Sequence, residues 1–195
     1  MSVNLIELGQ QLSPAFRSLE LLQKFVKSDL ANTLDALGRV EYRAAVAALR
    51  DAARSNDPAR EMESAITILR LAHQKFSENS KDSALKTSAR VVSTVVTGGL
   101  HTPSGFVWSA QADAECCVLL AACYASFSSG ELCRQYLHEA RKAFDLYIQS
   151  FRKWGELAYH RQPTLAAQRA NEAYDAEWPS FNEMCEAIER LVETD

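Results

Sequence analysis

Apolar side chains recur every three or four residues along most of the chain, which is the spacing of one face of an α-helix. Phe16, Leu19, Leu22 and Val26 show this spacing within residues 14–27. Residues 131–160 continue it and, at about 1.5 Å per residue, predict a helix roughly 45 Å long. The stretches between breaks are rich in Ala, Leu, Glu, Arg and Gln, which favour helix over strand. The pattern therefore predicts an all-α protein.

Start and stop signals divide this pattern into separate helices. Ser13-Pro14 and Asp57-Pro58 each combine an N-cap residue with proline at the first helical position, which is typical of a helix start. Four segments are expected to interrupt the helices: residues 77–83, 98–105 and 128–130, and Trp178-Pro179. We expect about seven helices, paired as antiparallel hairpins in one compact bundle that forms a single domain over residues 1–195.

One segment differs from the others in having no polar face. Residues 116–127 carry no charge, and both sides of the predicted helix are apolar or small. A helix that is apolar all round is typical of a protein core, and this one is shorter than the roughly 20 residues that cross a bilayer. We therefore expect residues 116–127 to form a central, buried helix.

A spacing pattern occurs twice in the chain. It runs Ala65-x-x-Ile68-Leu69-x-x-Ala72-x-x-x-Phe76, and it recurs 68 residues later as Cys133-x-x-Tyr136-Leu137-x-x-Ala140-x-x-x-Phe144. The copies lie in the second arms of predicted hairpins, around residues 41–77 and 109–160. The arrangement resembles degenerate tetratricopeptide-type hairpins, whose period is about 34 residues. The resemblance implies stacked helical hairpins, and chance similarity between two amphipathic helices is the alternative.

Composition places the chain among ordinary globular proteins. Its 195 residues are 47% hydrophobic and 24% charged, enough to fold around a core of its own. The start lacks a basic region followed by an apolar core, and no uncharged run approaches the length of a membrane span. We expect a soluble cytoplasmic protein without membrane contact. The five cysteines form no Cys-x-x-Cys pair and are expected to be buried free thiols.

The charge is unevenly distributed along the chain. A formal net charge of −4 argues against a nucleic-acid binder that relies on bulk positive charge. Residues 172–195 hold eight acids and a single base, Arg190, and so carry −7. They predict a final amphipathic helix whose carboxylates, including Glu183, Glu186 and Glu189, face solvent. We expect these carboxylates to contact a partner, for which a basic protein is suited, and solubility alone is the alternative.

A basic stripe is expected on the second helix. Four arginines there lie within about 60° of one another around the helix axis: Arg39, Arg43, Arg50 and Arg54. They are a second candidate contact surface, and the simpler interpretation is a solvated face on which Asp35 pairs with Arg39. Glu41 points among apolar residues if this helix is unbroken. Either Gly38 breaks the helix, or the carboxylate of Glu41 has a partner near the core.

Sequence signatures of catalysis and cofactor binding are missing. No histidine follows a glutamate at the Glu-x-x-His spacing of di-iron bundles, and Glu156 with His160 is interpreted as a surface pair. The chain has neither a nucleophile elbow nor a phosphate-binding glycine loop. We therefore expect no catalytic residues, no metal and no cofactor.

The glycine-rich segment 98–105 is the one break with chemical interest. His101 in it, and Phe106 and Trp108 just after it, are candidates for lining a pocket or contacting a partner, since functional residues concentrate on loops. An ordinary connector whose aromatic residues enter the core is the alternative.

Together these observations favour binding over catalysis. The expected function is that of a non-enzymatic module that binds another protein: an adaptor, a chaperone, or an immunity-type or other inhibitor. An all-α enzyme or small-ligand binder, with a pocket near residues 98–108, is the alternative. A nucleic-acid-associated regulator that uses the arginine stripe comes third.

Overall fold

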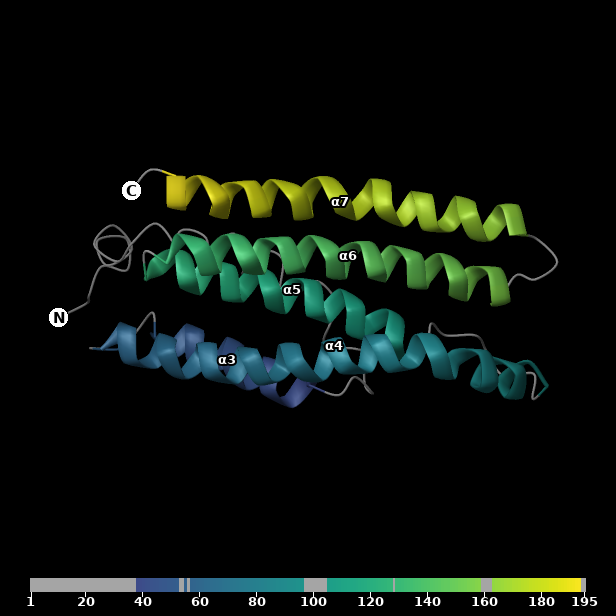
Figure 1. The fold of residues 1–195 in the computed structure, drawn as a ribbon, viewed down its shortest axis with the longest axis horizontal. Coiled ribbons are helices and arrows are strands. Elements are labelled where there is room, and N and C mark those ends of the chain that lie inside the picture. The colour runs from purple at the N-terminus through teal and green to yellow at the C-terminus, as the bar shows by residue number, and fades with distance from the viewer. Residues whose placement is uncertain are drawn as a thin grey trace.

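A computed structural model describes residues 38–52, 55, 57–96, 105–127, 129–158 and 163–193. Every regular element in these ranges is an α-helix, which confirms the all-α prediction. The helices are α3 (Arg39–Ala52), α4 (Pro58–Val96), α5 (Gly105–Ser126), α6 (Gly130–Ala158) and α7 (Pro163–Glu193) (Figure 1). The helix predicted over residues 14–27 lies outside the described residues.

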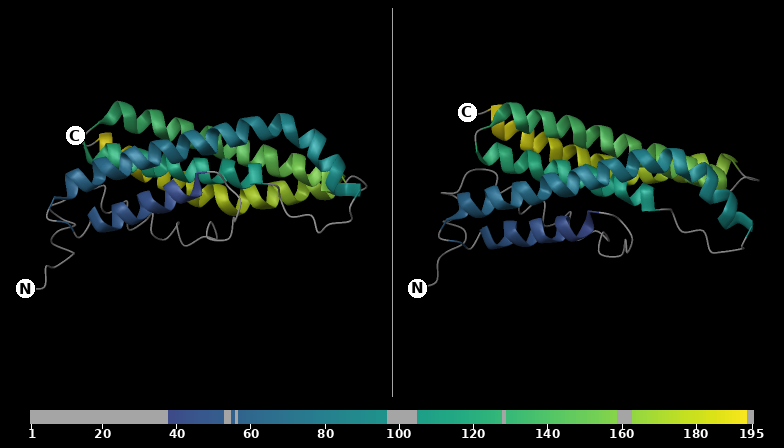
Figure 2. Two further views of the ribbon diagram at one scale, coloured as in Figure 1. Left: turned by 90° about the horizontal axis from the view of Figure 1, so that it is seen from below. Right: turned by 60° about the horizontal axis from the view of Figure 1, so that its bottom comes forward.

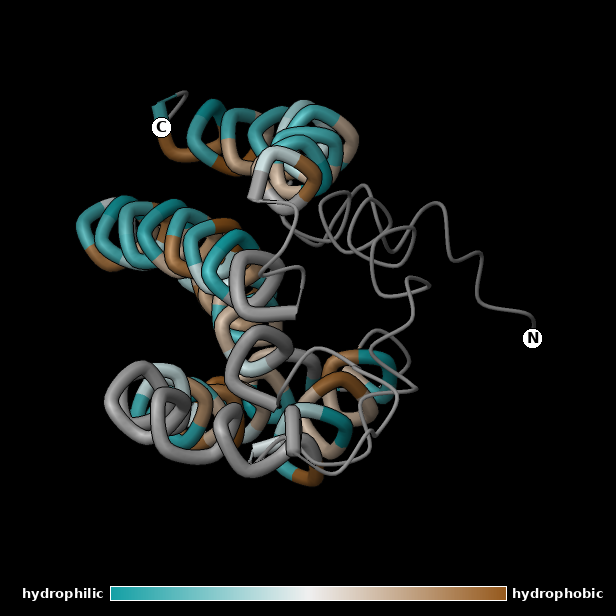
Figure 3. Tube along the Cα trace, turned by 90° about the vertical axis from the view of Figure 1, so that its right-hand side faces the viewer, coloured by the Kyte–Doolittle hydropathy of each residue, from teal (hydrophilic) through white to brown (hydrophobic). Residues whose placement is uncertain are grey.

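From α4 onwards, each helix packs against the one before it in the sequence. The pairs α3–α4, α4–α5, α5–α6 and α6–α7 make the main contacts, and α7 also touches α5. The long helices run side by side with their axes roughly aligned (Figures 1 and 2). Viewed nearly along these axes, they follow one another from α3 and α4 at the bottom to α7 at the top (Figure 3). The contacts support the predicted packing of hairpins into a bundle.

Helix α5 occupies the middle of this arrangement. All residues from Cys116 to Ala125 are buried, which confirms the prediction of a central apolar helix. At the end of the predicted segment, Ser126 is only partly buried, and Phe127, which follows the helix end, is 38% exposed. All five cysteines are free and buried, as predicted. Within the described ranges, no helix combines the length and the apolarity needed to cross a membrane.

Helix α4 runs through a segment where the sequence predicted a break. Residues 77–83 are polar, but they lie inside a continuous helix of 39 residues. Polarity alone does not end a helix, and the segment contains no glycine or proline. The buried Ser80 hydroxyl donates a hydrogen bond to the Ser77 carbonyl at 2.9 Å, so its polar group is satisfied within the helix.

Helix α7 likewise passes through a predicted break, at Trp178-Pro179. Pro179 is exposed and lies inside a helix of 31 residues. Proline removes one backbone hydrogen bond and crowds the preceding turn, which usually interrupts a helix. Aromatic packing on either side of Pro179 opposes this effect: Trp178 stacks on Tyr174 with ring centroids 5.4 Å apart, and Phe181 stacks on Phe144 of α6 at 4.6 Å. The described part of the chain therefore contains five helices, fewer than the seven or so expected, because α4 and α7 are each continuous and the helix predicted over residues 14–27 lies outside the described residues.

Helix α3 starts later than the sequence predicted. Gly38 has a backbone φ of 98° and immediately precedes the helix, so the expected helix from residue 28 does not run unbroken into α3. Glu41, in the first turn, forms an ion pair with Lys75 of α4. The hydrogen bond that the Lys75 ammonium donates to the Glu41 carboxylate lowers the pKa of Glu41. The first explanation therefore holds, since Gly38 precedes the helix with a positive φ, and the Glu41 carboxylate also has a partner, although both side chains of this ion pair are partly exposed rather than in the core.

Gly38 is expected to tolerate no side chain. A Cβ there lies 3.0 Å from the Ala72 carbonyl oxygen and 3.2 Å from Phe76 Cδ1, at a φ that L-residues rarely adopt. We expect Gly38→Ala to lower the free energy of unfolding by about 2 kcal/mol, measured by urea denaturation. An unchanged or raised midpoint would show that residue 38 does not hold this conformation.

The duplicated spacing pattern lies on α4 and α6 at equivalent levels of burial. Both copies bury four of their five positions: Ala65, Leu69, Ala72 and Phe76 in α4, and Cys133, Leu137, Ala140 and Phe144 in α6. Helix α4 alone is longer than an entire tetratricopeptide repeat of about 34 residues. The likeness therefore lies in the spacing of core positions rather than in the length of the helices.

Candidate functional site

The acidic residues singled out near the C-terminus divide into two groups. Glu183 and Glu186 are exposed on α7. Glu189 is half-buried, and its carboxylate accepts a hydrogen bond from Arg141 of α6 at 3.0 Å. Two of the three predicted carboxylates therefore face solvent, and the third ties α7 to α6.

The exposed acids of α7 share one face of the helix. Their sequence spacing returns to nearly the same angle at 100° per residue: Glu172, Asp175, Glu183, Glu186 and Glu193. We call these five residues the acidic stripe. Opposite them, Phe181, Met184, Cys185 and Ile188 are buried against the rest of the protein. Two bases accompany this stripe: Arg169 lies 3.5 Å from the Glu172 carboxylate, and the exposed Arg190 falls on the same face, between Glu186 and Glu193.

The predicted arginine stripe is described only in part. Arg43 and Arg50 are exposed on α3, seven residues apart and so on the same side of the helix. The side chain of Arg39 and the whole of Arg54 lie outside the described residues. The exposure of Arg43 and Arg50 fits both interpretations, a contact surface for a partner and a solvated face.

The candidate site predicted around the glycine-rich loop lies partly on a helix. Gly105, Phe106 and Trp108 are not loop residues, because α5 already begins at Gly105. The apolar spacing of α5 continues backwards through these positions, which explains why the helix extends further than expected. His101 lies outside the described residues, as do the side chains of Phe106 and Trp108.

A buried carboxylate on α5 was not anticipated from the sequence. Glu115 is 8% exposed, and the Tyr42 hydroxyl of α3 donates a hydrogen bond to its Oε2 at 3.4 Å. Burial raises the pKa of Glu115 to about 8; the hydrogen bond from Tyr42 opposes this increase, and the nearby Glu177 carboxylate adds to it. Glu115 is therefore a largely protonated acid at neutral pH.

Glu177 of α7 completes this cluster of acids and hydroxyls. Its carboxylate accepts hydrogen bonds from the Tyr147 hydroxyl of α6 at 3.1 Å and from the Gln111 amide of α5 at 3.5 Å. Partial burial raises its pKa as well. The cluster thus joins α3, α5, α6 and α7 through polar contacts inside an otherwise apolar core.

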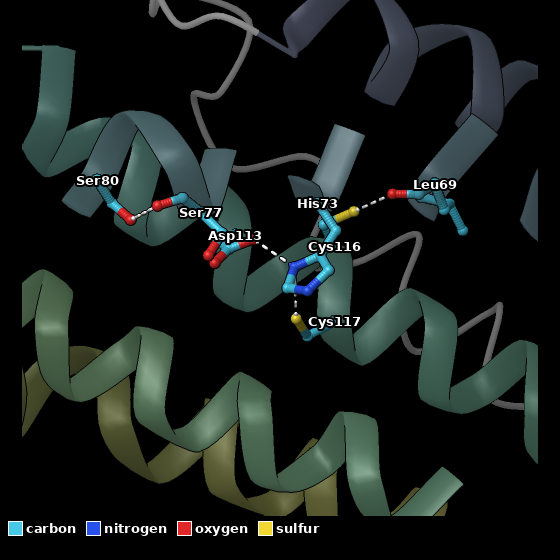
Figure 4. Close-up of polar contacts among 7 residues, drawn as sticks. All are labelled: Leu69, His73, Ser77, Ser80, Asp113, Cys116 and Cys117. Atoms are coloured by element: carbon cyan, nitrogen blue, oxygen red, sulfur yellow. Dashed lines mark hydrogen bonds and ion pairs between the residues drawn. The ribbon is translucent and has the colours of Figure 1, made fainter. Parts of the chain in front are cut away.

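A second polar cluster joins α4 to α5. Nδ1 of His73 lies 2.7 Å from Oδ1 of Asp113 and 3.3 Å from Sγ of Cys117 (Figure 4). Asp113 and Cys117 are buried, and the His73 side chain is 24% exposed. Burial raises the pKa of the Cys117 thiol well above its ordinary value. We call these three residues the His–Asp–Cys cluster.

Aromatic side chains border the His–Asp–Cys cluster on the side of α6. Tyr136 meets the His73 ring edge-on at 6.0 Å between centroids, and it stacks on Tyr124 at 5.5 Å. The guanidinium of Arg70 lies over the other ring of this stack, 5.8 Å from the Tyr124 centroid. These contacts hold the imidazole in place from outside.

The sequence contained one signal for this cluster. Asp113 and Cys117 are four residues apart, which places them on the same side of α5, one turn from each other. A search limited to Glu-x-x-His and Cys-x-x-Cys spacings misses this pair. His73 had no such signal, because it comes from a different helix, 40 residues before Asp113.

Comparison with protein-family models, curated proteins and solved structures found no match to the chain.

Proposed function

We propose that the protein is a non-enzymatic binding module that associates with another, basic protein, acting as an adaptor, chaperone or inhibitor. The acidic stripe on α7 carries this proposal. Its five exposed carboxylates lie on one side of a helix whose other side is held in the core. Exposed like charges repel one another, so a cationic surface gains attraction and also relieves this repulsion.

Of the three carboxylates predicted to contact a partner, Glu183 and Glu186 are suitable for a test by charge reversal, and Glu189 is not. Reversing the charge of Glu189 would break its contact with Arg141 and disturb the α6–α7 interface. Glu183 and Glu186 are exposed, and the Glu186 carboxylate accepts a hydrogen bond from the Asn182 side chain on the same helix at 2.6 Å. Their reversal therefore changes the surface charge with little effect on packing.

We expect the double variant Glu183→Lys and Glu186→Lys to bind its partner at least about 10-fold more weakly at low salt, chiefly through a slower association rate. The partner is first captured from native lysate on the wild-type protein and purified. Its association and dissociation rates with each variant are then measured by biolayer interferometry at increasing salt.

The matched control reverses two exposed acids elsewhere, Glu63 of α4 and Asp145 of α6, and so changes the net charge by the same amount. The control is expected to retain wild-type affinity. Equal weakening in both double variants would mean that only the net charge matters, and unaltered binding of Glu183→Lys, Glu186→Lys would remove the acidic stripe from the interface.

A further inference from the structure

Helix geometry and packing bring three potential metal ligands together in the His–Asp–Cys cluster. Asp113 and Cys117 project from successive turns of α5, and His73 reaches them from α4. The ligand atoms Nδ1, Oδ1 and Sγ all lie within 4.8 Å of one another. In a tetrahedral zinc site with bonds of about 2.0–2.3 Å, ligand atoms are about 3.3–3.7 Å apart. Small side-chain rotations are therefore enough to place all three atoms around one ion.

The atom of His73 that the two partners approach distinguishes a metal site from a nucleophile–histidine–acid catalytic triad. In a nucleophile–histidine–acid triad, the imidazole uses one ring nitrogen for each partner. Here Asp113 and Cys117 both approach Nδ1 of His73. A single nitrogen holds either one proton or one lone pair, so it does not bind both partners well through hydrogen bonds. A cation placed between the three atoms contacts all of them at once.

We propose that His73, Asp113 and Cys117 bind one Zn²⁺ ion between α4 and α5. An imidazole nitrogen, a carboxylate oxygen and a thiolate sulfur are the three donor types that zinc accepts. The carboxylate and the thiolate together balance the 2+ charge of the ion. Two ligands are buried and the His73 side chain is partly exposed, which gives the ion a way in from solvent.

Three protein ligands leave one coordination position for water or another small ligand. The bound ion crosslinks two helices whose ligands are 40 residues apart in sequence. It is therefore expected to stabilise the native state. This site is separate from the acidic stripe, and the two proposals succeed or fail independently.

Cobalt(II) is the probe, because it occupies zinc sites and its absorption reports thiolate ligation and tetrahedral geometry. Reduced, metal-free protein is titrated with Co²⁺ under anaerobic conditions. We expect one equivalent to bind with a thiolate-to-cobalt charge-transfer band in the near ultraviolet and tetrahedral d–d bands in the visible. Added Zn²⁺ is expected to displace the bound Co²⁺ and so to remove the charge-transfer band and the d–d bands.

Neighbouring cysteines provide a matched pair of variants. Cys117→Ser is expected to abolish the charge-transfer band. Cys116→Ser is expected to retain it, because the Cys116 thiol points away and donates a hydrogen bond to the Leu69 carbonyl at 3.2 Å. His73→Gln, at the partly exposed ligand, is expected to weaken binding by about 100-fold or more, beyond the roughly 10- to 100-fold typical of altering a supporting residue.

A thermal measurement keeps the test decisive if one variant folds poorly. Stoichiometric Zn²⁺ is expected to raise the Tm of the wild type and of Cys116→Ser, but not that of His73→Gln. The proposal is overturned if the reduced wild type binds no Co²⁺, if the band persists in Cys117→Ser, or if Cys116→Ser loses it to the same degree.

Discussion

Replacing Glu115 by glutamine is expected to make the protein less sensitive to alkaline pH. The carboxyl has a pKa of about 8 in the folded protein and an ordinary value of 4.5. Below pH 4.5 it is protonated in both the folded and unfolded states. Between these two values folding takes up a proton, so stability falls as pH rises. Above pH 8 the full cost, about 5 kcal/mol, has been reached.

Glutamine removes this cost, since it is neutral at every pH and its carbonyl still accepts a hydrogen bond from Tyr42. Tyr42 of α3, Glu177 of α7 and, on α5 itself, Cys116 are the ionisable groups that influence this position electrostatically, together with Tyr147 of α6. All of them are unchanged in Glu115→Gln. The difference between the two proteins therefore reports the Glu115 carboxyl together with its effect on these neighbours.

Between pH 6 and pH 9 we expect the wild type to lose about 3 kcal/mol of unfolding free energy relative to Glu115→Gln. Urea denaturation at the two pH values, with reducing agent and a chelator present, provides the measurement. The exposed Glu186→Gln is the control and is expected to follow the wild type. A pH dependence of Glu115→Gln that parallels the wild type would show instead that the Glu115 carboxyl is already ionised at pH 6.

Truncating Phe144 is expected to have the largest effect among single substitutions at the α6–α7 interface. Its ring is 3% exposed and stacks on Phe181 at 4.6 Å. It also meets Trp178 at 5.3 Å and Tyr174 at 6.3 Å. Phe144→Ala removes a ring of α6 that contacts aromatic residues of α7 both before and after Pro179.

We expect Phe144→Ala to lower the free energy of unfolding by about 4 kcal/mol, as is typical when a buried phenylalanine leaves a cavity. The same substitution at Phe127, which is 38% exposed, is expected to cost less than about 1 kcal/mol. Urea denaturation of both variants decides the comparison. Similar losses at the two sites would show that α7 is not held through the ring of Phe144.

The fold class and the central helix could be predicted from the sequence alone. An α-helix follows a fixed period of 3.6 residues, so the side on which a residue lies is determined by its neighbours in sequence. For this reason the burial of Cys116 and the exposure of Glu183 and Glu186 were both deducible. The spacing of Asp113 and Cys117 on one side of α5 was accessible in the same way.

Helix continuity was decided by the tertiary structure. The sequence indicated breaks at residues 77–83 and at Pro179, because polar residues and proline weaken helices locally. Packing of Trp178 and Phe181 against Phe144 outweighs this local preference in α7. Such contacts involve a different helix, about 35 residues away in sequence, and do not appear in the pattern around the proline.

The polar clusters also depend on how the helices pack. His73 meets Asp113 across 40 residues, and Tyr42 meets Glu115 across 73. The period of each helix fixes which residues share a face, but it leaves open which faces meet and how far one helix slides along the next. Close packing of the apolar faces determines that register, and with it the partners of every buried polar group.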